Sequence, residues 1–296
     1  MTTTAVVGLG IMGSAIAQHL LDAGCEVLGY DVDDARVRQL ERMGGTALTS
    51  VREAAERGGV VLTSLPGSGP ALEVCRELAA GAREGLVVVE TSTLPHGVKN
   101  SCRDLLRAAG GDLLDCPLSG TGAQARVRDV VVYGSGDEAA FERVRGVLEI
   151  FSRSVRYLGA FGSGSTMKLV ANLLVAVHNA ATAEAFALGE AAGLDPQRIY
   201  DTIRDGAGNS VIFEKRGQLM VDHAYRPATA KISMFVKDTG LIAEFADGLG
   251  LELPVLEATR PLYDRAVERG LADADAAALL ETMGTRAHRP DDEDHE

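Results

Sequence analysis

The sequence predicts an α/β protein in which a doubly wound parallel sheet is followed by an all-helical C-terminal domain. Three observations support this. Short β-rich runs alternate with helical stretches in the first half of the chain, a glycine-rich turn directly follows the first run, and no strand pattern appears after residue 159. Alternation at this spacing is typical of a parallel sheet with helices on both faces.

The first half supplies all of the expected strands, at 5–7, 26–30, 60–64, 86–90, 113–114, 130–133 and 155–158. Helices are expected between them at 11–23, 33–43, 95–109 and 138–150. Beyond residue 159 only helices are expected, at 166–192, 196–204, 211–221, 235–249, 254–269 and 275–283. The 166–192 stretch is too densely apolar for a helix exposed on one side, which favours a homodimer or homotetramer.

These elements divide the chain into two domains and a tail. The sheet domain is expected to cover residues 1–162 and the all-α domain residues 163–288, with a boundary near the glycines of 159–164. Residues 289–296 are strongly acidic, and we expect a disordered tail there.

Composition excludes several classes of protein. The chain has 296 residues and 31.1 kDa, 46% of its residues are hydrophobic, and its net charge is −13. An acidic chain of this kind is unsuited to binding nucleic acid or an anionic membrane surface. No stretch approaches 18 uninterrupted apolar residues, so no transmembrane helix is expected. Four cysteines without C-x-x-C spacing or clustered histidines predict no metal site and fit a reducing cytoplasm.

Lysine is rare in this chain. Of the 29 basic residues only five are lysines, at Lys99, Lys168, Lys215, Lys231 and Lys237. Ammonium and guanidinium groups differ in hydration and in pKa, so the few positions that keep lysine are candidates for a specific role. The alternative is that these lysines are remnants of drift.

The first chemical motif is G-x-G-x-x-G, formed by Gly8, Gly10 and Gly13 with Ile11 and Met12 in the spacer. It lies directly after an expected strand and opens an expected helix. In that setting Gly8 permits the tight turn, Gly10 lets the backbone approach a pyrophosphate, and Gly13 lets helix and strand pack closely. The motif therefore predicts a Rossmann-type, dinucleotide-binding N-terminal domain.

Asp31 follows the second expected strand, eighteen residues after Gly13. A carboxylate at this point is placed to accept hydrogen bonds from an adenosine ribose, and it repels a 2′-phosphate. Residues 32–34 offer no cation, and Arg36 is the first one after Asp31. The sequence therefore favours NAD over NADP. The alternative is that Asp31 caps the next helix, although Asp33 is better placed as a cap.

Four blocks in order resemble the β-hydroxyacid dehydrogenase family, to which 3-hydroxyisobutyrate dehydrogenase and tartronate semialdehyde reductase belong. They are GLGIMGSAIAQHL (8–20), DCPLSGTGAQA (115–125), GSGSTMKLVAN (162–172) and KDTGLIAEFA (237–246). They resemble the N-terminal signature, the substrate-binding block, the catalytic block and a late cofactor-associated block, and together they cover nearly the whole chain. The resemblance implies an NAD-dependent oxidoreductase that interconverts a small hydroxy acid and its semialdehyde or keto acid.

The resemblance implies that Lys168 is catalytic and that Asn172 orients the substrate and the lysine. Hydride reduction of a carbonyl leaves negative charge on its oxygen, so a nearby ammonium group can give up its proton. In the oxidation direction the neutral amine takes the alcohol proton. The alternative is a solvated lysine with a capping asparagine close by.

Ser119, Gly120 and Thr121 stand where the family has Ser-Gly-Gly, which implies that they bind the substrate carboxylate. Backbone N–H groups of a glycine-containing loop, together with a hydroxyl, suit that role. Thr121 departs from the family pattern: it narrows or repolarises the pocket, or it is a plain turn residue. His19 stands where asparagine is usual, and we expect it to be a surface change.

Three further positions resemble cofactor-binding sites of the family. Leu65 and Pro66 resemble its Leu-Pro turn, and Thr93 matches a position near the nicotinamide ribose. Lys237 resembles a lysine that closes over the cofactor. The alternatives are that Thr93 is a helix N-cap before Pro95, and that Lys237 forms an ion pair with Asp238.

Three other functions remain open. Imine reductases resemble this chain in fold and cofactor turn, but they generally carry another residue at the position of Lys168. A phosphogluconate-type decarboxylase is expected to have a larger helical domain. A non-catalytic dinucleotide-binding protein would have no use for Lys168 and Asn172 together.

Overall fold

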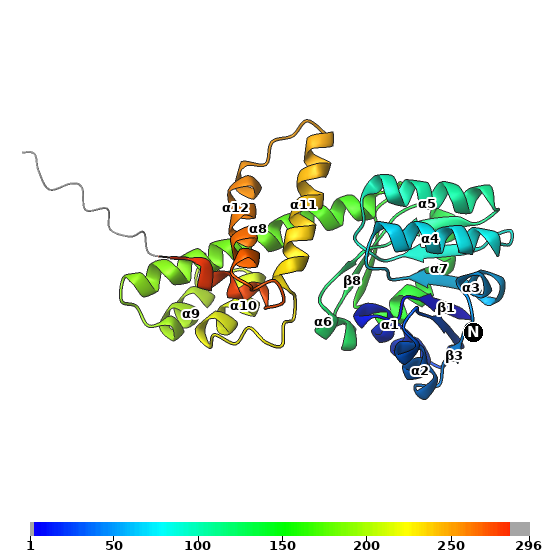
Figure 1. The fold of residues 1–296 in the computed structure, drawn as a ribbon, viewed down its shortest axis with the longest axis horizontal. Helices are drawn as coiled ribbons and strands as arrows, with labels where there is room; N and C mark the ends of the chain where they lie inside the picture. The colour runs from blue at the N-terminus through cyan, green and yellow to red at the C-terminus, as the bar shows by residue number, and fades with distance from the viewer. Residues whose placement is uncertain (1–2, 285–296) are drawn as a thin grey trace, which may run out of the picture. The chain divides into compact units, whose positions relative to one another are not determined.

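The computed structural model describes residues 3–284 (Figure 1). The chain divides after Ala171 into two compact units, which are described separately. The helix α8 (Ser163–Ala191) begins in the first unit and continues into the second. The expected acidic tail at 289–296 lies outside the described residues.

A six-stranded parallel sheet forms the centre of the first unit, in the order β3-β2-β1-β4-β5-β6. Its strands are β1 (Thr4–Val7), β2 (Val27–Tyr30), β3 (Thr46–Ala47), β4 (Val60–Thr63), β5 (Val87–Glu90) and β6 (Asp112–Asp115). The order confirms the doubly wound class, in which ligands bind where the strand order reverses. The register places the last residues of five strands in one row: Tyr30, Val7, Thr63, Glu90 and Asp115.

A second, three-stranded sheet lies outside this order. It contains β7 (Leu118–Ser119), β8 (Val131–Gly134) and β9 (Ser154–Tyr157), with β7 antiparallel and β9 parallel to β8. The strands expected near 130–133 and 155–158 are therefore present, but in this separate sheet. The sequence analysis missed β7, because a strand of two residues shows no alternation.

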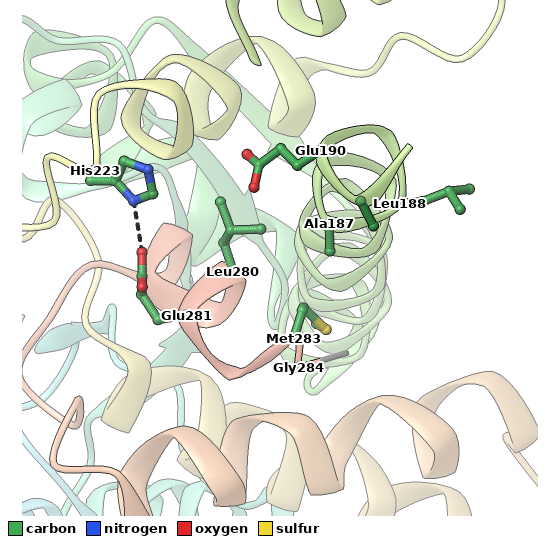
Figure 2. A pocket seen from close by; sticks show the side chains of 9 residues that line it. Ala187, Leu188, Glu190, His223, Leu280, Glu281, Met283 and Gly284 are labelled. Carbon is green, nitrogen blue, oxygen red and sulfur yellow. Dashed lines mark hydrogen bonds and ion pairs between the residues drawn. The ribbon is translucent and has the colours of Figure 1, made fainter. Parts of the chain in front are cut away.

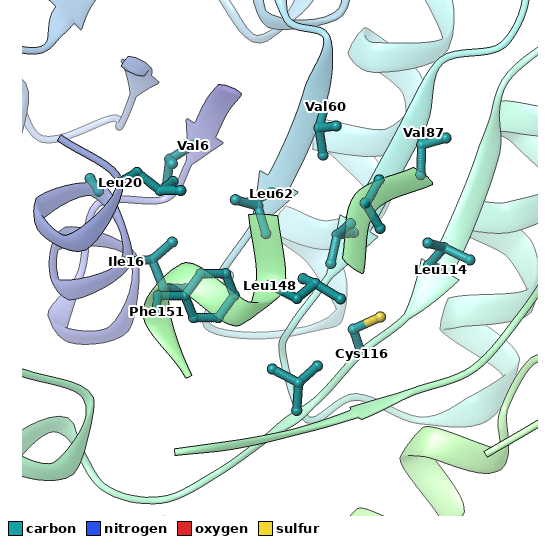
Figure 3. Close-up of a cluster of buried hydrophobic side chains, with 14 of the residues drawn as sticks. Val6, Ile16, Leu20, Val60, Leu62, Val87, Leu114, Cys116, Leu148 and Phe151 are labelled. Carbon is teal, nitrogen blue, oxygen red and sulfur yellow. The ribbon is translucent and has the colours of Figure 1, made fainter. Parts of the chain in front are cut away.

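Helices cover both faces of the large sheet. On one face are α1 (Ile11–Asp22), α2 (Asp34–Arg42) and α7 (Glu138–Phe151), where Ile16, Leu20 and Leu148 pack with Val6 and Leu62 (Figure 3). On the other are α3 (Val51–Arg57), α4 (Ser68–Ala80) and α5 (His96–Ala108). Successive strand residues point to opposite faces, so Val61, next to Leu62, packs with this second group. Of these helices, α3 and α4 were not expected from the sequence.

The second unit is helical among its described residues. After α8 come α9 (Pro196–Arg204), α10 (Val211–Val221), α11 (Ile232–Gly248), α12 (Pro254–Glu268) and the 3₁₀ helix η1 (Ala276–Thr282). The helix expected at 275–283 is thus a 3₁₀ helix. Its residues from Ala276 to Leu280 are all buried, so its composition shows no amphipathic period that would distinguish the two types.

The helix α8 has 29 residues and a mean hydropathy of 1.3 over its most apolar window. By length and composition alone it is apolar enough to cross a membrane, although the sequence analysis expected no such helix. Core helices of other proteins meet the same criterion, and 39% of that window is buried inside this structure. Ala176, Ala183 and Phe186 belong to the hydrophobic core of the second unit.

In the second unit a buried ion pair joins α10 to the segment that precedes η1. Arg216 of α10 pairs with Asp275, which precedes η1, and the two side chains are 6% and 1% exposed. Asp275 also accepts hydrogen bonds from the backbone N–H groups of Thr229 at 2.8 Å and Ala277 at 3.0 Å. Burial alone would raise the pKa of Asp275, but Arg216 and these donors hold it below its usual value.

The pKa of Asp275 is lower in the folded chain than in the unfolded chain, where it is near 4. Its ionised carboxylate therefore stabilises the fold above about pH 4, and this contribution is lost as the pH falls through the pKa of the folded state. We expect Arg216→Met to lower the free energy of unfolding by about 3–5 kcal/mol at neutral pH. This deficit should shrink as the pH falls, because without Arg216 burial raises the pKa of Asp275 and protonation then removes the unpaired charge. Urea unfolding followed by circular dichroism between pH 7 and pH 2 measures both effects.

The matched control is Lys231→Met, which removes the partner of Asp273 in an exposed pair only two residues away from Asp275. Surface pairs contribute little, so this variant should unfold close to the wild type. Equal losses in the two variants would show that burial of the Arg216–Asp275 pair is not what stabilises the unit.

Candidate active site

The glycine turn between β1 and α1 leaves no space for side chains on its inner side. A Cβ atom on Gly8 would lie 2.2 Å from the carbonyl oxygen of Ser64, and one on Gly13 would lie 1.8 Å from that of Gly8. Gly8 also has a positive φ of 91°. Gly10 is different, because the nearest atom to its added Cβ is Nη1 of Arg36 at 3.7 Å. The turn is therefore closed against the sheet and accessible at Gly10.

The start of α1 offers hydrogen-bond donors to an anion. Gly10 is its N-cap, and no side chain of residues 3–284 caps it. Ile11 is exposed and Met12 is partly buried against the core. Uncapped N–H groups and the positive end of the helix dipole are what a pyrophosphate needs, so these residues fit a dinucleotide.

Asp31 connects the end of β2 to this turn. Its Oδ2 accepts a hydrogen bond from the backbone N–H of Leu9 at 2.7 Å, and its Oδ1 accepts one from that of Asp33 at 2.9 Å. The cap of α2 is Asp33, so Asp31 does not take the alternative role of helix cap. Arg36 also approaches, with Nη1 3.3 Å from Asp31 Oδ2. In the sequence Arg36 is only the first cation after Asp31, but the first turn of α2 brings it to both Asp31 and Gly10.

The loops after β4 and β5 are joined by side-chain hydrogen bonds. The backbone N–H of Leu65 donates to Ser92 Oγ at 2.8 Å, and that of Ser92 donates to Glu90 Oε1 at 2.8 Å. Leu65 also lies beside the glycine turn, with its Cδ2 3.4 Å from a Cβ added to Gly8. Thus the loop carrying Leu65 and Pro66 and the loop carrying Thr93 are held together. Pro95 is the N-cap residue of α5.

The substrate-type block lies at the small sheet. Ser119 is in β7, and Gly120 has a φ of 145° with its added Cβ 2.8 Å from Val130. Thr121 caps α6 (Gly122–Arg126) in a capping box with Gln124. Thr121 is therefore a helix cap, which is close to the alternative of a turn residue. Its hydroxyl donates to Gln124 Oε1 at 3.3 Å and accepts from the backbone N–H of Gln124 at 3.4 Å.

Two contacts place this block beside the glycine turn. A Cβ on Gly122 would lie 2.2 Å from Ile11 Cγ2, so α6 begins in close contact with the start of α1. The Nε2 atom of His19 lies 2.8 Å from the carbonyl oxygen of Ala125. The expectation that His19 is a surface change was wrong, because its ring is partly buried and links α1 to α6.

Lys168 is partly buried in the second turn of α8. The start of this helix contacts the loop of Thr93 through His96, whose Nε2 lies 3.2 Å from Gly162 O and 3.1 Å from Thr166 Oγ1. Within the first unit, the expected catalytic helix therefore begins beside an expected cofactor loop.

A buried ion cluster lies at the ends of β5 and β6. Lys99 of α5 places its Nζ 2.6 Å from Asp115 Oδ1 and 2.7 Å from Glu90 Oε2, and all three residues are at most 1% exposed. Burial alone would lower the pKa of Lys99, but the two carboxylates outweigh it and raise that pKa. Burial would likewise raise the pKa of Asp115, but Lys99 and Ser165 bring it below its usual value.

In the second unit, Asn172 and Lys237 meet at one carboxylate. Asn172 Nδ2 donates to Asp238 Oδ2 at 2.8 Å, and Lys237 Nζ lies 3.3 Å from Asp238 Oδ1. The ion pair that was the alternative for Lys237 is therefore present. Sequence reasoning named Asp238 only as that ion-pair partner, and its place in the late block KDTGL was the signal that could have identified it.

A pocket of about 460 Å³ lies elsewhere in the second unit, between α8, His223 and η1 (Figure 2). His223 Nδ1 and Glu281 Oε1 are 2.8 Å apart at its rim. None of the site residues expected from the sequence lines this pocket. Its lining includes Gly284, the last residue that the structure describes.

Two family models match the chain and together cover most of it. The NAD binding domain of 6-phosphogluconate dehydrogenase matches residues 3–159. The model described as NAD-binding of NADP-dependent 3-hydroxyisobutyrate dehydrogenase matches residues 162–283.

Relatives match over nearly their full length. An L-threonate dehydrogenase of Cupriavidus necator is 34% identical over 93% of this chain and 94% of its own. The 2-hydroxy-3-oxopropionate reductase of Escherichia coli is 28% identical over 95% and 97%. Among solved structures, a 3-hydroxyisobutyrate dehydrogenase from Salmonella typhimurium has a TM-score of 0.86 and 31% identity over 96% of this chain and 100% of its own. The chain therefore belongs to the β-hydroxyacid dehydrogenase family, as a dinucleotide-binding hydroxyacid dehydrogenase.

Proposed function

We propose that this enzyme uses NAD to interconvert a small hydroxy acid and its semialdehyde or keto acid, with Lys168 as the general acid and base. One observation carries the proposal. Within the first unit, the glycine turn lies against the substrate-type block, and His96, the first residue of α5 after the loop of Thr93, contacts the helix of Lys168. A bound nicotinamide supplies the hydride acceptor or donor at such a site.

The protein's own residues have three tasks in this proposal. Ser119, Gly120 and Thr121 bind the substrate carboxylate through backbone N–H groups and the hydroxyl of Ser119, since the Thr121 hydroxyl is used in the capping box of α6. In oxidation, neutral Lys168 accepts the hydroxyl proton as the carbon loses its hydride; in reduction, the ammonium form returns that proton to the oxygen. Asn172 orients the substrate, and Asp238 and Lys237 fix the position of its amide.

The cofactor is proposed to bind at Gly8, Gly10, Ile11, Met12 and Gly13, with Asp31 on the adenosine ribose and Leu65, Pro66, Thr93 and Lys237 towards the nicotinamide. We keep 1–162 as the NAD-binding domain and 163–288 as the domain for substrate binding and oligomerisation, and the two matched family models support this division. Exposed Met167, Val170 and Leu174 on α8 support a homodimer or homotetramer. Four free cysteines support a cytoplasmic location.

Relatives guide the choice of substrate. One relative that is 34% identical is an L-threonate dehydrogenase, and L-threonate is a four-carbon hydroxy acid. Imine reductases are also structural neighbours, but a Myxococcus stipitatus variant is only 19% identical with a TM-score of 0.66, which shows a shared fold alone. We therefore propose hydroxy acids, with L-threonate in the first test panel beside 3-hydroxyisobutyrate and glycerate.

The first test is NADH formation from NAD⁺ with this panel. We expect turnover with at least one acid, and a fall in kcat of about 10²–10⁴-fold in Lys168→Ala, because proton transfer contributes that much. NADH binding, measured by fluorescence, should persist in the variant. Lys215→Ala, which alters an exposed lysine of α10, is the matched control and should keep wild-type kcat. Unchanged turnover in Lys168→Ala would contradict the proposed role.

The second test concerns cofactor choice. We expect the wild type to prefer NAD, because Asp31 repels a 2′-phosphate, and Asp31→Asn to raise the NADP/NAD ratio of kcat/KM by at least ~10-fold. Arg36 lies beside both Asp31 and Asp33 and is half exposed, so once residue 31 is neutral its guanidinium can turn from the remaining pair with Asp33 to the phosphate. The double variant Asp31→Asn/Arg36→Ala should lose most of that gain. A wild type that prefers NADP would refute the NAD proposal.

A further inference from the structure

The start of α8 is attached to the buried cluster of Glu90, Lys99 and Asp115. Asp115 Oδ2 accepts a hydrogen bond from the backbone N–H of Ser165 at 2.7 Å, and its Oδ1 accepts one from Ser165 Oγ at 2.8 Å. Ser165 is itself buried. A charged acceptor makes these bonds stronger than neutral ones, so the first turn of α8 is fixed to the end of β6.

A second serine completes this attachment. Ser135 Oγ accepts a hydrogen bond from the backbone N–H of Gly164 at 2.9 Å and lies 3.2 Å from Asp115 Oδ2. A Cβ on Gly164 would lie 2.3 Å from the carbonyl oxygen of Tyr133. The helix therefore begins in direct backbone contact with β8, and two of its first N–H groups end in the same cluster.

The cluster extends in the other direction to the loops proposed to hold the cofactor. Glu90 uses Oε2 for Lys99 and Oε1 for the backbone N–H of Ser92, whose hydroxyl accepts the N–H of Leu65. One connected set of buried and partly buried polar contacts thus joins the loop of Leu65, the loop of Thr93 and the start of α8. The proposed reaction does not otherwise use these three ionised groups.

We propose that Glu90, Lys99 and Asp115 are positioning residues, which hold Lys168 in its working place through Ser135 and Ser165. Lys168 is three residues after Ser165 in one helix, so the anchored first turn fixes the origin of its side chain. This inference rests on the proposed role of Lys168. Lys99 contacts both carboxylates, and without its charge they would repel one another across a buried space and release the helix end.

The test uses variants that keep all three charges, because Lys99→Met would leave two unpaired buried carboxylates and could prevent folding. We expect the double variant Ser135→Ala/Ser165→Ala to lower kcat at least ~10-fold, since small misplacements of a reacting group are costly. The Kd for NADH should stay within about twofold of the wild-type value, because the cofactor loops keep their own contacts. The matched control is Ser152→Ala, which alters a buried serine of the same unit whose hydroxyl donates to the carbonyl oxygen of Leu148 at 2.7 Å; it should keep wild-type kcat.

A double-mutant cycle separates positioning from general loosening. If the two serines act through Lys168, their removal should cause little further loss of the residual kcat in Lys168→Ala. An equal fold-loss in both backgrounds, or unchanged kcat in the serine variant, would overturn the inference alone. Full activity of Lys168→Ala would overturn the proposed function and this inference together. A fall in the kcat of Ser152→Ala equal to that of the serine pair would also overturn the inference.

Discussion

Two carboxylates and one ammonium group share a fully buried space at the carboxyl edge of the large sheet. Breaking such a set by removing one member costs about 3–5 kcal/mol, because a charge is then left without a partner away from water. The arrangement exists because the register ends β5 at Glu90 and β6 at Asp115 in adjacent positions. α5 then supplies Lys99 between them. The strand order thus places the two carboxylates side by side, and Asp115 in turn binds the first turn of α8.

The glycine turn depends on a different constraint, which is close backbone approach. Gly13 lies so near Gly8 that only hydrogen fits between them, and Gly8 lies as near to the end of β4. The same closeness continues at Gly122 against Ile11, which brings the substrate-type block to the turn. The contacts of Gly8 with Ser64 and of Gly122 with the Ile11 side chain thus bring together segments that are far apart in the sequence. The open side at Gly10 is what remains for a ligand.

Much of this fold could be predicted from the sequence, because its strands are apolar runs and its long helices carry clear boundaries. The elements that were missed are the short ones. α3 has seven residues and β7 has two, too few for a period to appear, and α4 begins with Ser68-Gly69-Pro70, which reads as a turn. The division into two sheets also escaped, since the antiparallel pairing of β7 with β8 depends on a long-range register.

The site divides in the same way. The glycine turn could be predicted because the G-x-G-x-x-G spacing is typical of one backbone geometry, and this holds for Gly8, Gly10, Gly13 and, after the next strand, Asp31. The expectation for His19 was wrong, because its place in the sequence does not show that it meets α6. The contact of Arg36 with Asp31 likewise depends on a helix turn and was not predicted. The pair of Lys237 with Asp238 was named only as an alternative and is present. The bond from Asn172 to Asp238 spans 66 residues and left no local pattern.

The rarity of lysine was the one compositional signal that pointed beyond the motifs. At Lys99 the structure shows why a lysine and not an arginine stands there. A single Nζ there lies 2.6 and 2.7 Å from two carboxylates in a space closed to water. An ammonium group is a compact point charge that can serve two acceptors from one atom, whereas the planar guanidinium fork needs more room and favours one carboxylate in a bidentate pair. Lys231 shows the contrast, because its exposed pair with Asp273 makes no such demand. Scarcity thus identifies a lysine only where burial and geometry both exclude arginine, and among these five Lys99 meets both conditions.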